Sequence, residues 1–219
     1  MPSYEGIRCF VTGVGGSVEI ACSAVSGKTL VLPEQTHSVN VGIVTNPSQH
    51  FPATDALITQ LADVALGIRT ADCVPVLFYS PDINAIAAAH AGWKGSLGGI
   101  VDLVVDKLVE LGASLSEIRV IFSVSICGKC YEVDDELAGR FADAGFTSCI
   151  SRVVGEKPHL DLQRVNEVRL RMKGILPEHV TLDRQCTKCS VSDEGNSLYY
   201  SWRRQPGISD RNYSVICFE

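Results

Sequence analysis

The chain has 219 residues, of which 46% are hydrophobic and 20% charged, and its formal net charge is −6. This length suits one domain with one core, which we expect to span residues 1–219. The acidic balance argues against nucleic acid as a partner. Because no apolar run reaches the ~18 residues of a membrane span and no basic segment precedes one, we expect no transmembrane helix and no signal peptide.

Short apolar runs bounded by turn residues indicate strands along most of the chain. Apolar residues recur at three- and four-residue spacing in residues 96–111, which predicts the clearest helix, and two more helices are expected at 135–144 and 162–174. Because strands and helices interleave, the fold class is α/β or mixed α+β. The expected strands are 7–12, 18–23, 30–32, 39–45, 56–59, 64–70, 118–124, 198–204 and 213–218, one closing at residue 182, and one on each side of a turn at 80–82.

The two strands around the turn at 80–82 carry the residues with the clearest chemistry. Cys73 stands in a polar triplet just before an apolar run, and His90 ends an alanine-rich run and is followed by glycines. If the strands fold back on one another, the thiolate and the imidazole meet. The alternative remains open, because a lone cysteine and a lone histidine in apolar surroundings usually belong to a core.

His37 is the best third member of this group, because it also lies at a boundary between a loop and a strand. Two histidines and one cysteine form a three-ligand zinc set that leaves a fourth position for water or substrate. Copper can use the same donors. We therefore predict that His37, Cys73 and His90 are metal ligands and catalytic residues. The helix at 96–111 begins just after His90, so its first amides and Lys94 are expected to hold an anion such as phosphate.

The nine cysteines are scattered over the whole chain. An odd, dispersed set in a chain of this size favours reduced thiols and a cytoplasmic location over a disulfide framework. Two Cys-x-x-Cys pairs, 127/130 and 186/189, could together form a structural zinc site, although their separation is much longer than in a zinc ribbon. We favour the interpretation that these four cysteines mainly serve packing.

Five motifs follow one another along the chain: Gln35-Thr36-His37, Ala71-Asp72-Cys73-Val74-Pro75, Ala89-His90-Ala91-Gly92-Trp93-Lys94-Gly95, Cys130-Tyr131-Glu132-Val133 and Ser201-Trp202-Arg203-Arg204. With these motifs the sequence resembles the YfiH-type, laccase-domain family, whose members have been called polyphenol oxidases and purine nucleoside phosphorylases. The resemblance runs from about residue 7 to the C-terminus, and the motifs at 71–75 and 89–95 are highly specific together.

The resemblance implies a four-layered α/β/β/α sandwich with mixed sheets and a metal held by His37, Cys73 and His90. It also implies cytoplasmic enzymes that act on purine nucleosides, with phosphorolysis and adenosine deamination both attributed to the family. The chain departs from the family pattern in ways that bear on the substrate pocket more than on the metal residues. Ser123-Val124 replaces Gly-Pro, Cys127 and Asp210 each replace glycine, and the segment between Gly16 and Gln35 is short.

The leading hypothesis is a zinc-dependent purine nucleoside phosphorylase, with adenosine deamination at the same metal as a second activity. Zinc would polarise phosphate or water, or generate hydroxide near neutral pH. Lys94 is the predicted phosphate contact, and Tyr131 and Arg203 are predicted to contact the nucleoside; solvated, packed or ion-paired roles are the alternatives for these three. The oligomeric state stays open.

Three other functions are alternatives to this hypothesis. A copper polyphenol oxidase conflicts with the presence of only five histidines and no His-x-His pair, although one copper could still bind the three ligands. A cysteine hydrolase that cuts an amide in peptidoglycan precursors would use Cys73 as nucleophile and His90 or His37 as base. A binding or scaffold protein ranks last, because all three ligand positions are filled.

Overall fold

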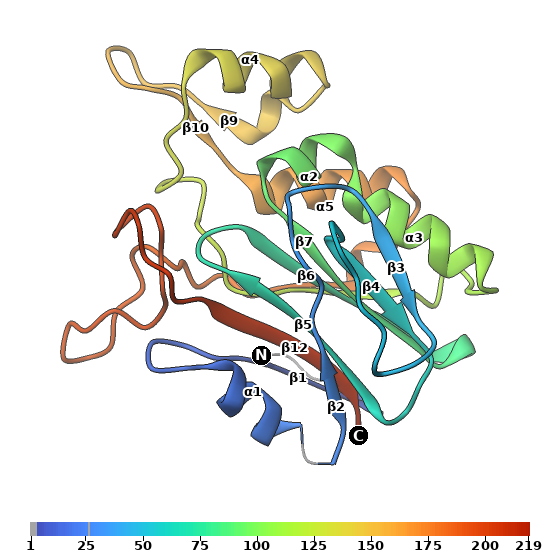
Figure 1. Cartoon of the computed structure of the whole chain (residues 1–219). Helices are drawn as coiled ribbons and strands as arrows, with labels where there is room; N and C mark the ends of the chain where they lie inside the picture. The colour runs from blue at the N-terminus through green and yellow to red at the C-terminus, as the bar shows by residue number, and fades with distance from the viewer. Residues whose placement is uncertain (1–3, 26) are drawn as a thin grey trace.

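The computed structural model describes residues 4–25 and 27–219, in which two β-sheets pack face to face between two layers of helices (Figure 1). The smaller sheet has the order β1-β12-β5-β2 and the larger one the order β11-β8-β6-β7-β4-β3, and both mix parallel and antiparallel pairs. The predicted fold class and the four-layered α/β/β/α arrangement are confirmed.

The bounds of the elements follow from the backbone hydrogen bonds. The smaller sheet consists of β1 (Ile7–Val11), β2 (Thr29–Val31), β5 (Val64–Thr70) and β12 (Asn212–Phe218). The larger sheet consists of β3 (Val41–Val44), β4 (Ala56–Thr59), β6 (Val74–Ser80), β7 (Ala85–Ala91), β8 (Arg119–Phe122) and β11 (Val180–Leu182). The helices are α1 (Val18–Ala24), α2 (Trp93–Gly98), α3 (Ile100–Glu110), α4 (Asp135–Asp143) and α5 (Leu162–Met172), and a two-stranded ribbon pairs β9 (Ile150–Ser151) with β10 (His159–Leu160).

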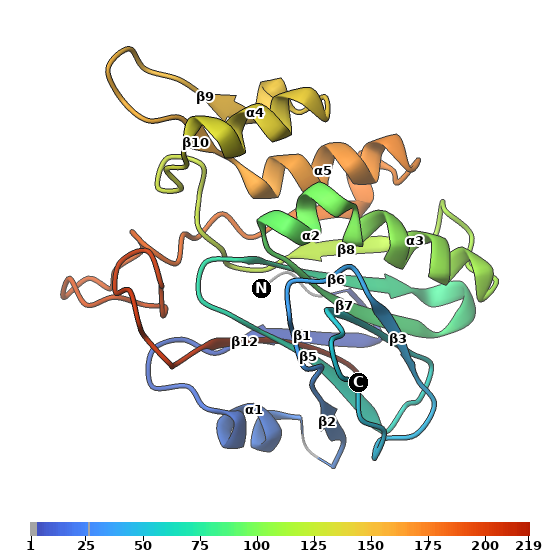
Figure 2. The same cartoon turned by 45° about the horizontal axis from the view of Figure 1, so that its top comes forward.

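Three apolar cores separate the four layers. Figure 2 shows the layers of helices and strands in a second view. The middle core lies between the sheets and includes Leu66 and Ile68 of β5 and Ile86 and Ala88 of β7. A second core joins the outer face of the larger sheet to α3 and α5, and a small third core packs α1 on the smaller sheet. Strands β6 and β7 are buried on both faces, which explains their continuous apolar runs. None of the helices in the described residues is long and apolar enough to cross a membrane.

The predicted strand at 18–23 was wrong, because this segment forms α1. Ser17 caps the helix by accepting a hydrogen bond from the Ile20 amide, and Ala21 and Val25 then share one buried face at helical spacing. Alternating β-branched residues had favoured a strand, but the cap and the tertiary contact decide the outcome.

Two other predictions need correction. The helix at 96–111 begins earlier, at Trp93, and is divided by Gly99, whose φ of 81° is left-handed, so α2 and α3 are separate helices. The expected strand at 198–204 is irregular, because the amide and carbonyl of Tyr200 bond to the Asn212 side chain instead of to a strand. The remaining predicted strands and helices overlap observed ones, with ends shifted by one or a few residues.

Candidate active site

Cys73 and His90 meet at one end of the seam between the two sheets. His90 is the penultimate residue of β7 and lies on the same face as Ile86 and Ala88, which face the other sheet. Pro75 of β6 pairs with His90, so Cys73, two residues before Pro75, continues that face beyond the strand. The two strands fold back on one another as predicted, and His37 approaches from the loop before β3.

The three predicted metal ligands converge. One donor atom from each of His37, Cys73 and His90 lies within 4.8 Å of the other two. Cys73 Sγ is 3.9 Å from His37 Nε2, and the two imidazole rings have centroids 4.7 Å apart at an interplanar angle of 71°. His90 is buried, Cys73 is half-buried and His37 is exposed, so the group is open on one side.

A buried carboxylate, Asp55, positions both histidines. It lies directly before β4 and is 0% exposed. His90 Nδ1 is 2.7 Å from Asp55 Oδ1, so Nδ1 carries the proton toward Asp55 and Nε2 is left to face the group. The same carboxylate accepts hydrogen bonds from the amides of Thr36, His37 and Ser38 and from the Ser38 hydroxyl. Burial opposes ionisation of Asp55, but these hydrogen bonds, led by the one from His90, hold its pKa well below the usual range.

The thiol and the imidazole perturb each other's ionisation. Burial disfavours a charged Cys73, but hydrogen bonding to His37 and His90 and the charge on those rings outweigh it and lower the pKa of Cys73 to about 6. Burial likewise disfavours a charged His90, but Asp55 and then Cys73 raise its pKa to about 9. Between these values the metal-free group holds a thiolate beside an imidazolium.

We expect Cys73 of metal-stripped protein to be alkylated by iodoacetamide with a midpoint near pH 6. Because the thiolate is the nucleophile and the pKa is lowered, the rate should fall as pH drops below 6 and level off above about 7. Peptide mass spectrometry of samples alkylated at a series of pH values measures the rate at Cys73, with the exposed Cys22 as an internal reference in the same protein. Identical profiles for the two cysteines would contradict the prediction.

Two residues at the site have left-handed backbones. His37 has a φ of 61° and Asp72 a φ of 103°, conformations that cost about 1–3 kcal/mol each in residues other than glycine. The surrounding hydrogen bonds impose them: the His37 amide is held by Asp55, and the Asp72 carboxylate accepts from the Thr187 hydroxyl and the Arg203 amide. Asp72 directly precedes Cys73, so these contacts also fix the position of the sulfur.

Gly92 completes the fit of the three donors. A Cβ at this position would lie 3.0 Å from Cys73 Sγ and 3.0 Å from His37 Cδ2, so only glycine leaves the two side chains in place. Soft and borderline donors, one thiolate and two imidazoles, suit zinc or copper. The residues present therefore fit a three-ligand metal site.

Replacement of Gly92 by alanine is expected to weaken metal binding more than stability. The φ of Gly92 is −69°, so alanine brings no backbone strain, and the added methyl acts through its contacts with Cys73 and His37. Displaced ligands should lower metal affinity about 10- to 100-fold, the loss typical of disturbed ligand positioning. Competition with a chelator measures this, and Gly139→Ala, where a Cβ meets nothing within 4 Å, is the control.

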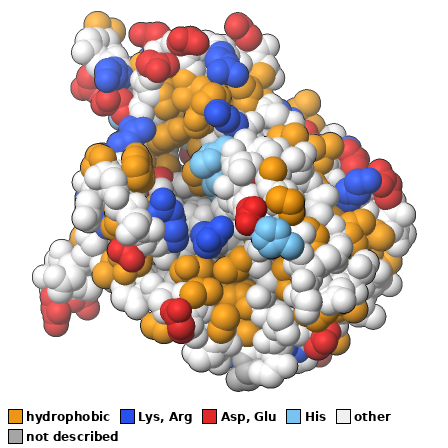
Figure 3. Space-filling model, in the orientation of Figure 1, with side chains coloured by type: hydrophobic (Ala, Val, Ile, Leu, Met, Phe, Trp, Pro, Cys, Tyr) orange, Lys and Arg blue, Asp and Glu red, His pale blue; other side chains and the backbone are white. Residues whose placement is uncertain are grey.

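The three donors lie in the wall of a cavity of about 690 Å³. Figure 3 shows the hollow flanked by basic and histidine side chains. Arginines outnumber acidic residues in the wall, and three aromatic rings provide flat apolar surface. The Thr70 hydroxyl, also in the wall, is buried and has no hydrogen-bond partner in the described part of the chain. The lining residues are Gln35, His37, Arg69, Thr70, Ala71, Asp72, Cys73, His90, Trp93, Tyr131, Trp202, Arg203, Ser209 and Arg211.

Of the predicted substrate contacts, Tyr131 and Arg203 line this cavity and Lys94 does not. The Arg203 guanidinium lies 5.0 Å from the centroid of the Tyr131 ring and donates to the Glu132 carbonyl. Lys94 is exposed, with its ammonium 5.6 Å from the Trp93 ring centroid, and α2 has only six residues. The predicted phosphate contact of Lys94 stays a prediction, but the wall offers three arginines instead.

Sequence reasoning missed Asp55 and the arginines at 69 and 211 as site residues. The signal for Asp55 was a carboxylate directly ahead of the apolar run Ala56-Leu57-Ile58, because burial at such a position requires partners. Arg69 reaches the cavity from the end of β5, where it caps the Pro33 carbonyl, and Arg211 directly precedes β12. Their nearness to Cys73 depends on strand pairing across the chain.

Comparison with known proteins places the chain in a family and agrees with its mixed α/β fold. The family model described as multi-copper polyphenol oxidoreductase laccase matches residues 14–219, so the chain belongs to this family. The predicted resemblance to YfiH-type proteins is confirmed: the crystal structure of Bacillus licheniformis hypothetical protein YfiH has a TM-score of 0.83 and 28% identity, covering 91% of this chain and 78% of that one.

Curated relatives carry enzyme names. A purine nucleoside phosphorylase from Deinococcus radiodurans is 36% identical over 182 residues, which are 83% of this chain and 67% of that protein. A protein named adenosine deaminase, from an unknown prokaryotic organism, is 30% identical over 204 residues, which are 85% of this chain and 74% of that protein.

Proposed function

We propose that this protein is a zinc-dependent purine nucleoside phosphorylase. The observation that carries the proposal is the single cavity wall that combines the His37, Cys73 and His90 donors, three arginines and three aromatic rings. The names of the relatives from Deinococcus radiodurans and other bacteria support the same reaction.

The arginines suit phosphate. Guanidinium groups bind phosphate oxygens bidentately, and Arg69, Arg203 and Arg211 all line the cavity. Asp72 is the sole carboxylate among the described residues of its wall. Asp72 is already engaged by Thr187 and the Arg203 amide, so its charge is directed away from the substrate. Phosphate held there would be positioned next to the metal ligands.

The aromatic rings suit a purine base. Trp93, Tyr131 and Trp202 offer faces on which a base can stack. Burial, followed by the charge of Cys73, raises the pKa of Tyr131 to about 12, so its hydroxyl stays protonated at neutral pH and can donate to the base or ribose. The unpartnered Thr70 hydroxyl is a second candidate donor for the ribose.

In phosphorolysis, a phosphate oxygen bonds to C1′ of the ribose as the C1′–N9 bond breaks. The electron pair of that bond goes to N9 of the base, which takes up a proton, and the products are ribose 1-phosphate and the free purine. His37, Cys73 and His90 would hold the zinc, with His90 oriented by Asp55. A zinc ion with three protein ligands supplies a Lewis acid, or a bound water of lowered pKa, at its open position.

Adenosine deamination is the second candidate at the same cavity, and the relative named adenosine deaminase favours it. In this reaction a water oxygen adds to C6 of adenine and ammonia leaves, so phosphate takes no part. Phosphate dependence therefore separates the two activities.

The experiment is product analysis by chromatography after purified protein of known metal content is incubated with inosine or adenosine, with and without phosphate. Phosphate-dependent release of hypoxanthine or adenine is the expected result. Inosine formed from adenosine without phosphate would assign the deaminase reaction. No turnover by zinc-loaded protein would overturn both and bring forward copper-dependent phenol oxidation or amide hydrolysis.

A further inference from the structure

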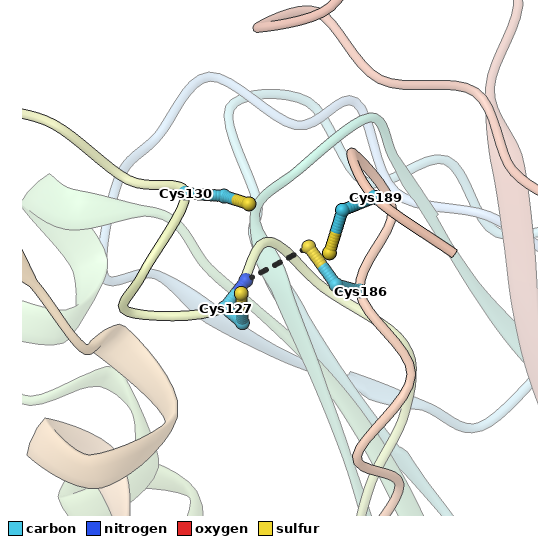
Figure 4. Close-up of side chains that lie close together, drawn as sticks. All are labelled: Cys127, Cys130, Cys186 and Cys189. Carbon is cyan, nitrogen blue, oxygen red and sulfur yellow. Dashed lines mark hydrogen bonds between the residues drawn. The ribbon is translucent and has the colours of Figure 1, made fainter. Parts of the chain in front are cut away.

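A second group of metal-ligand side chains lies outside the candidate active site. The sulfur atoms of Cys127, Cys130, Cys186 and Cys189 all lie within 4.8 Å of one another. Figure 4 shows the four side chains gathered between the two segments that carry them. This differs from the expectation that the four are packing cysteines. Cys189 is exposed and Cys127 and Cys130 are only half-buried, so three of the four contribute little to a core.

The topology explains how residues 59 positions apart come together. Strands β8 and β11 are parallel neighbours, and one Cys-x-x-Cys turn follows each strand. Because parallel strands end at the same edge of a sheet, both turns leave it side by side. The pairing continues beyond the strands, with a parallel bridge between Ser125 and Cys186 and a hydrogen bond from the Thr187 amide to the Ser125 carbonyl.

The local geometry is that of a metal-binding turn. The amide of Cys130 donates to the Cys127 carbonyl at 2.9 Å, and the amide of Ser190 donates to the Cys186 carbonyl at 3.0 Å, so both turns are closed. The Cys127 amide donates to Cys186 Sγ at 3.3 Å, an arrangement that stabilises a thiolate. Four sulfurs at Zn–S distances of about 2.3 Å would be about 3.8 Å apart in a tetrahedron, so only a small contraction of the present group is needed.

We propose that Cys127, Cys130, Cys186 and Cys189 bind one zinc ion in a closed, structural tetrathiolate site. Four protein ligands leave no position for water or substrate, which is the property that separates structural from catalytic zinc sites. The complex would carry two negative charges, and each turn has a lysine, Lys129 or Lys188, just before its second cysteine to offset them.

The site would hold the segment that positions Cys73. Ile126, just before Cys127, donates its amide to the Asp72 carbonyl at 2.9 Å, and Thr187, between Cys186 and Cys189, donates its hydroxyl to the Asp72 carboxylate at 2.7 Å. Both turns therefore contact the left-handed residue that directly precedes Cys73.

The turn at residues 186–189 also holds part of the cavity wall. The Arg204 guanidinium donates to the carbonyls of Thr187 and Lys188, and the neighbouring Arg203 amide donates to Asp72. Loss of zinc here would loosen Trp202 and Arg203 while the three ligands of the candidate active site stay in the chain.

Zinc content and thiol protection test the proposal without any assay of turnover. By elemental analysis, wild-type protein should hold one more zinc ion per chain than the double variant Cys186→Ser/Cys189→Ser. The variant Cys73→Ala should retain the tetrathiolate zinc whether or not the proposed phosphorylase activity exists. Cobalt loaded in place of zinc should give strong sulfur-to-cobalt absorption in Cys73→Ala protein that is absent from the double variant.

Two exposed cysteines provide a matched comparison in wild-type protein, which decides the question if the double variant does not fold. Cys22 and Cys189 are both exposed, but we expect iodoacetamide to modify Cys22 at once and Cys189 only after a zinc chelator is added. Equal rates for the two in zinc-loaded protein would overturn the proposal. Unchanged zinc content in the double variant, iron in place of zinc, or a disulfide among the four cysteines would overturn it as well.

Discussion

Replacement of Cys73 by alanine is expected to remove the metal of the candidate active site and to lower turnover by more than about 100-fold. Disturbing a residue that only supports a metal ligand costs 10- to 100-fold, and Cys73 supplies a donor atom itself. Its loss also removes a thiolate that favours protonation of His90, so a neutral His90 imidazole forms more easily. The weaker metal binding is therefore expected from the missing donor atom and not from a change in the charge of His90. Metal analysis and chromatography of nucleoside products measure the two effects.

The matched control for Cys73→Ala is Cys22→Ala, on the exposed face of α1. Metal content and turnover should stay at wild-type values in the control. If the thiolate is instead a nucleophile, chelation of the wild-type protein should leave or increase activity while Cys73→Ala abolishes it. Activity that disappears with the metal and returns with zinc contradicts the nucleophile hypothesis.

Replacement of Asp55 by asparagine is expected to destabilise the protein by about 3 kcal/mol and to impair metal binding. Asp55 Oδ2 accepts hydrogen bonds from the Thr36 and Ser38 amides, and Oδ1 accepts from His37 and His90. An asparagine side chain has only one acceptor oxygen, so its NH₂ group would replace the other carboxylate oxygen and face N–H donors. Because residue 55 is 0% exposed, water could not relieve this mismatch. Removing one member of a buried, hydrogen-bonded charge pair typically costs 3–5 kcal/mol.

Urea unfolding of metal-free and zinc-loaded protein measures this prediction. The sign of its pH dependence follows from the lowered pKa of Asp55: the carboxylate contributes stability above its unfolded pKa of about 3.9 and loses it as pH falls toward the folded value. The wild-type protein should therefore lose more stability than the variant below about pH 4. Asp63 is exposed, so Asp63→Asn is the control. An equal loss of unfolding free energy in Asp55→Asn and Asp63→Asn protein would contradict the role of Asp55.

Much of the fold could be predicted because the strongest local signals agree with the tertiary structure. β6 and β7 are apolar runs whose polar residues lie near the strand ends, and burial on both faces is the usual reason for such a run. The segment that forms α1 carries a weak local signal, since its seven residues include two β-branched ones and its stability comes from Ser17 and from contact with the smaller sheet. Local pattern alone does not contain that contact.

The contacts at the candidate sites also differ in how far the local sequence predicts them. Cys73 directly precedes β6 and His90 lies on β7, and a short turn joins these two strands, so the meeting of the two residues follows from a single hairpin. The Asp55 contact requires the pairing of β4 with β7, and the four-cysteine group requires the parallel pairing of β8 with β11. Neither pairing has a signature in the residues that it brings together, which is why the Cys-x-x-Cys pairs were interpreted as packing.

The position of β12 between β1 and β5 has a consequence for how the protein acquires its cavity. In this sheet Ile7 pairs with Phe218, and Asn212 and Tyr213 pair with Thr70 and Arg69 of the cavity wall. Contacts between such distant parts of a chain close large loops and form slowly. On the ribosome, residues 37, 73 and 90 emerge long before residues 212–218 are synthesised, so the predicted metal ligands can be assembled early and the cavity wall is completed last.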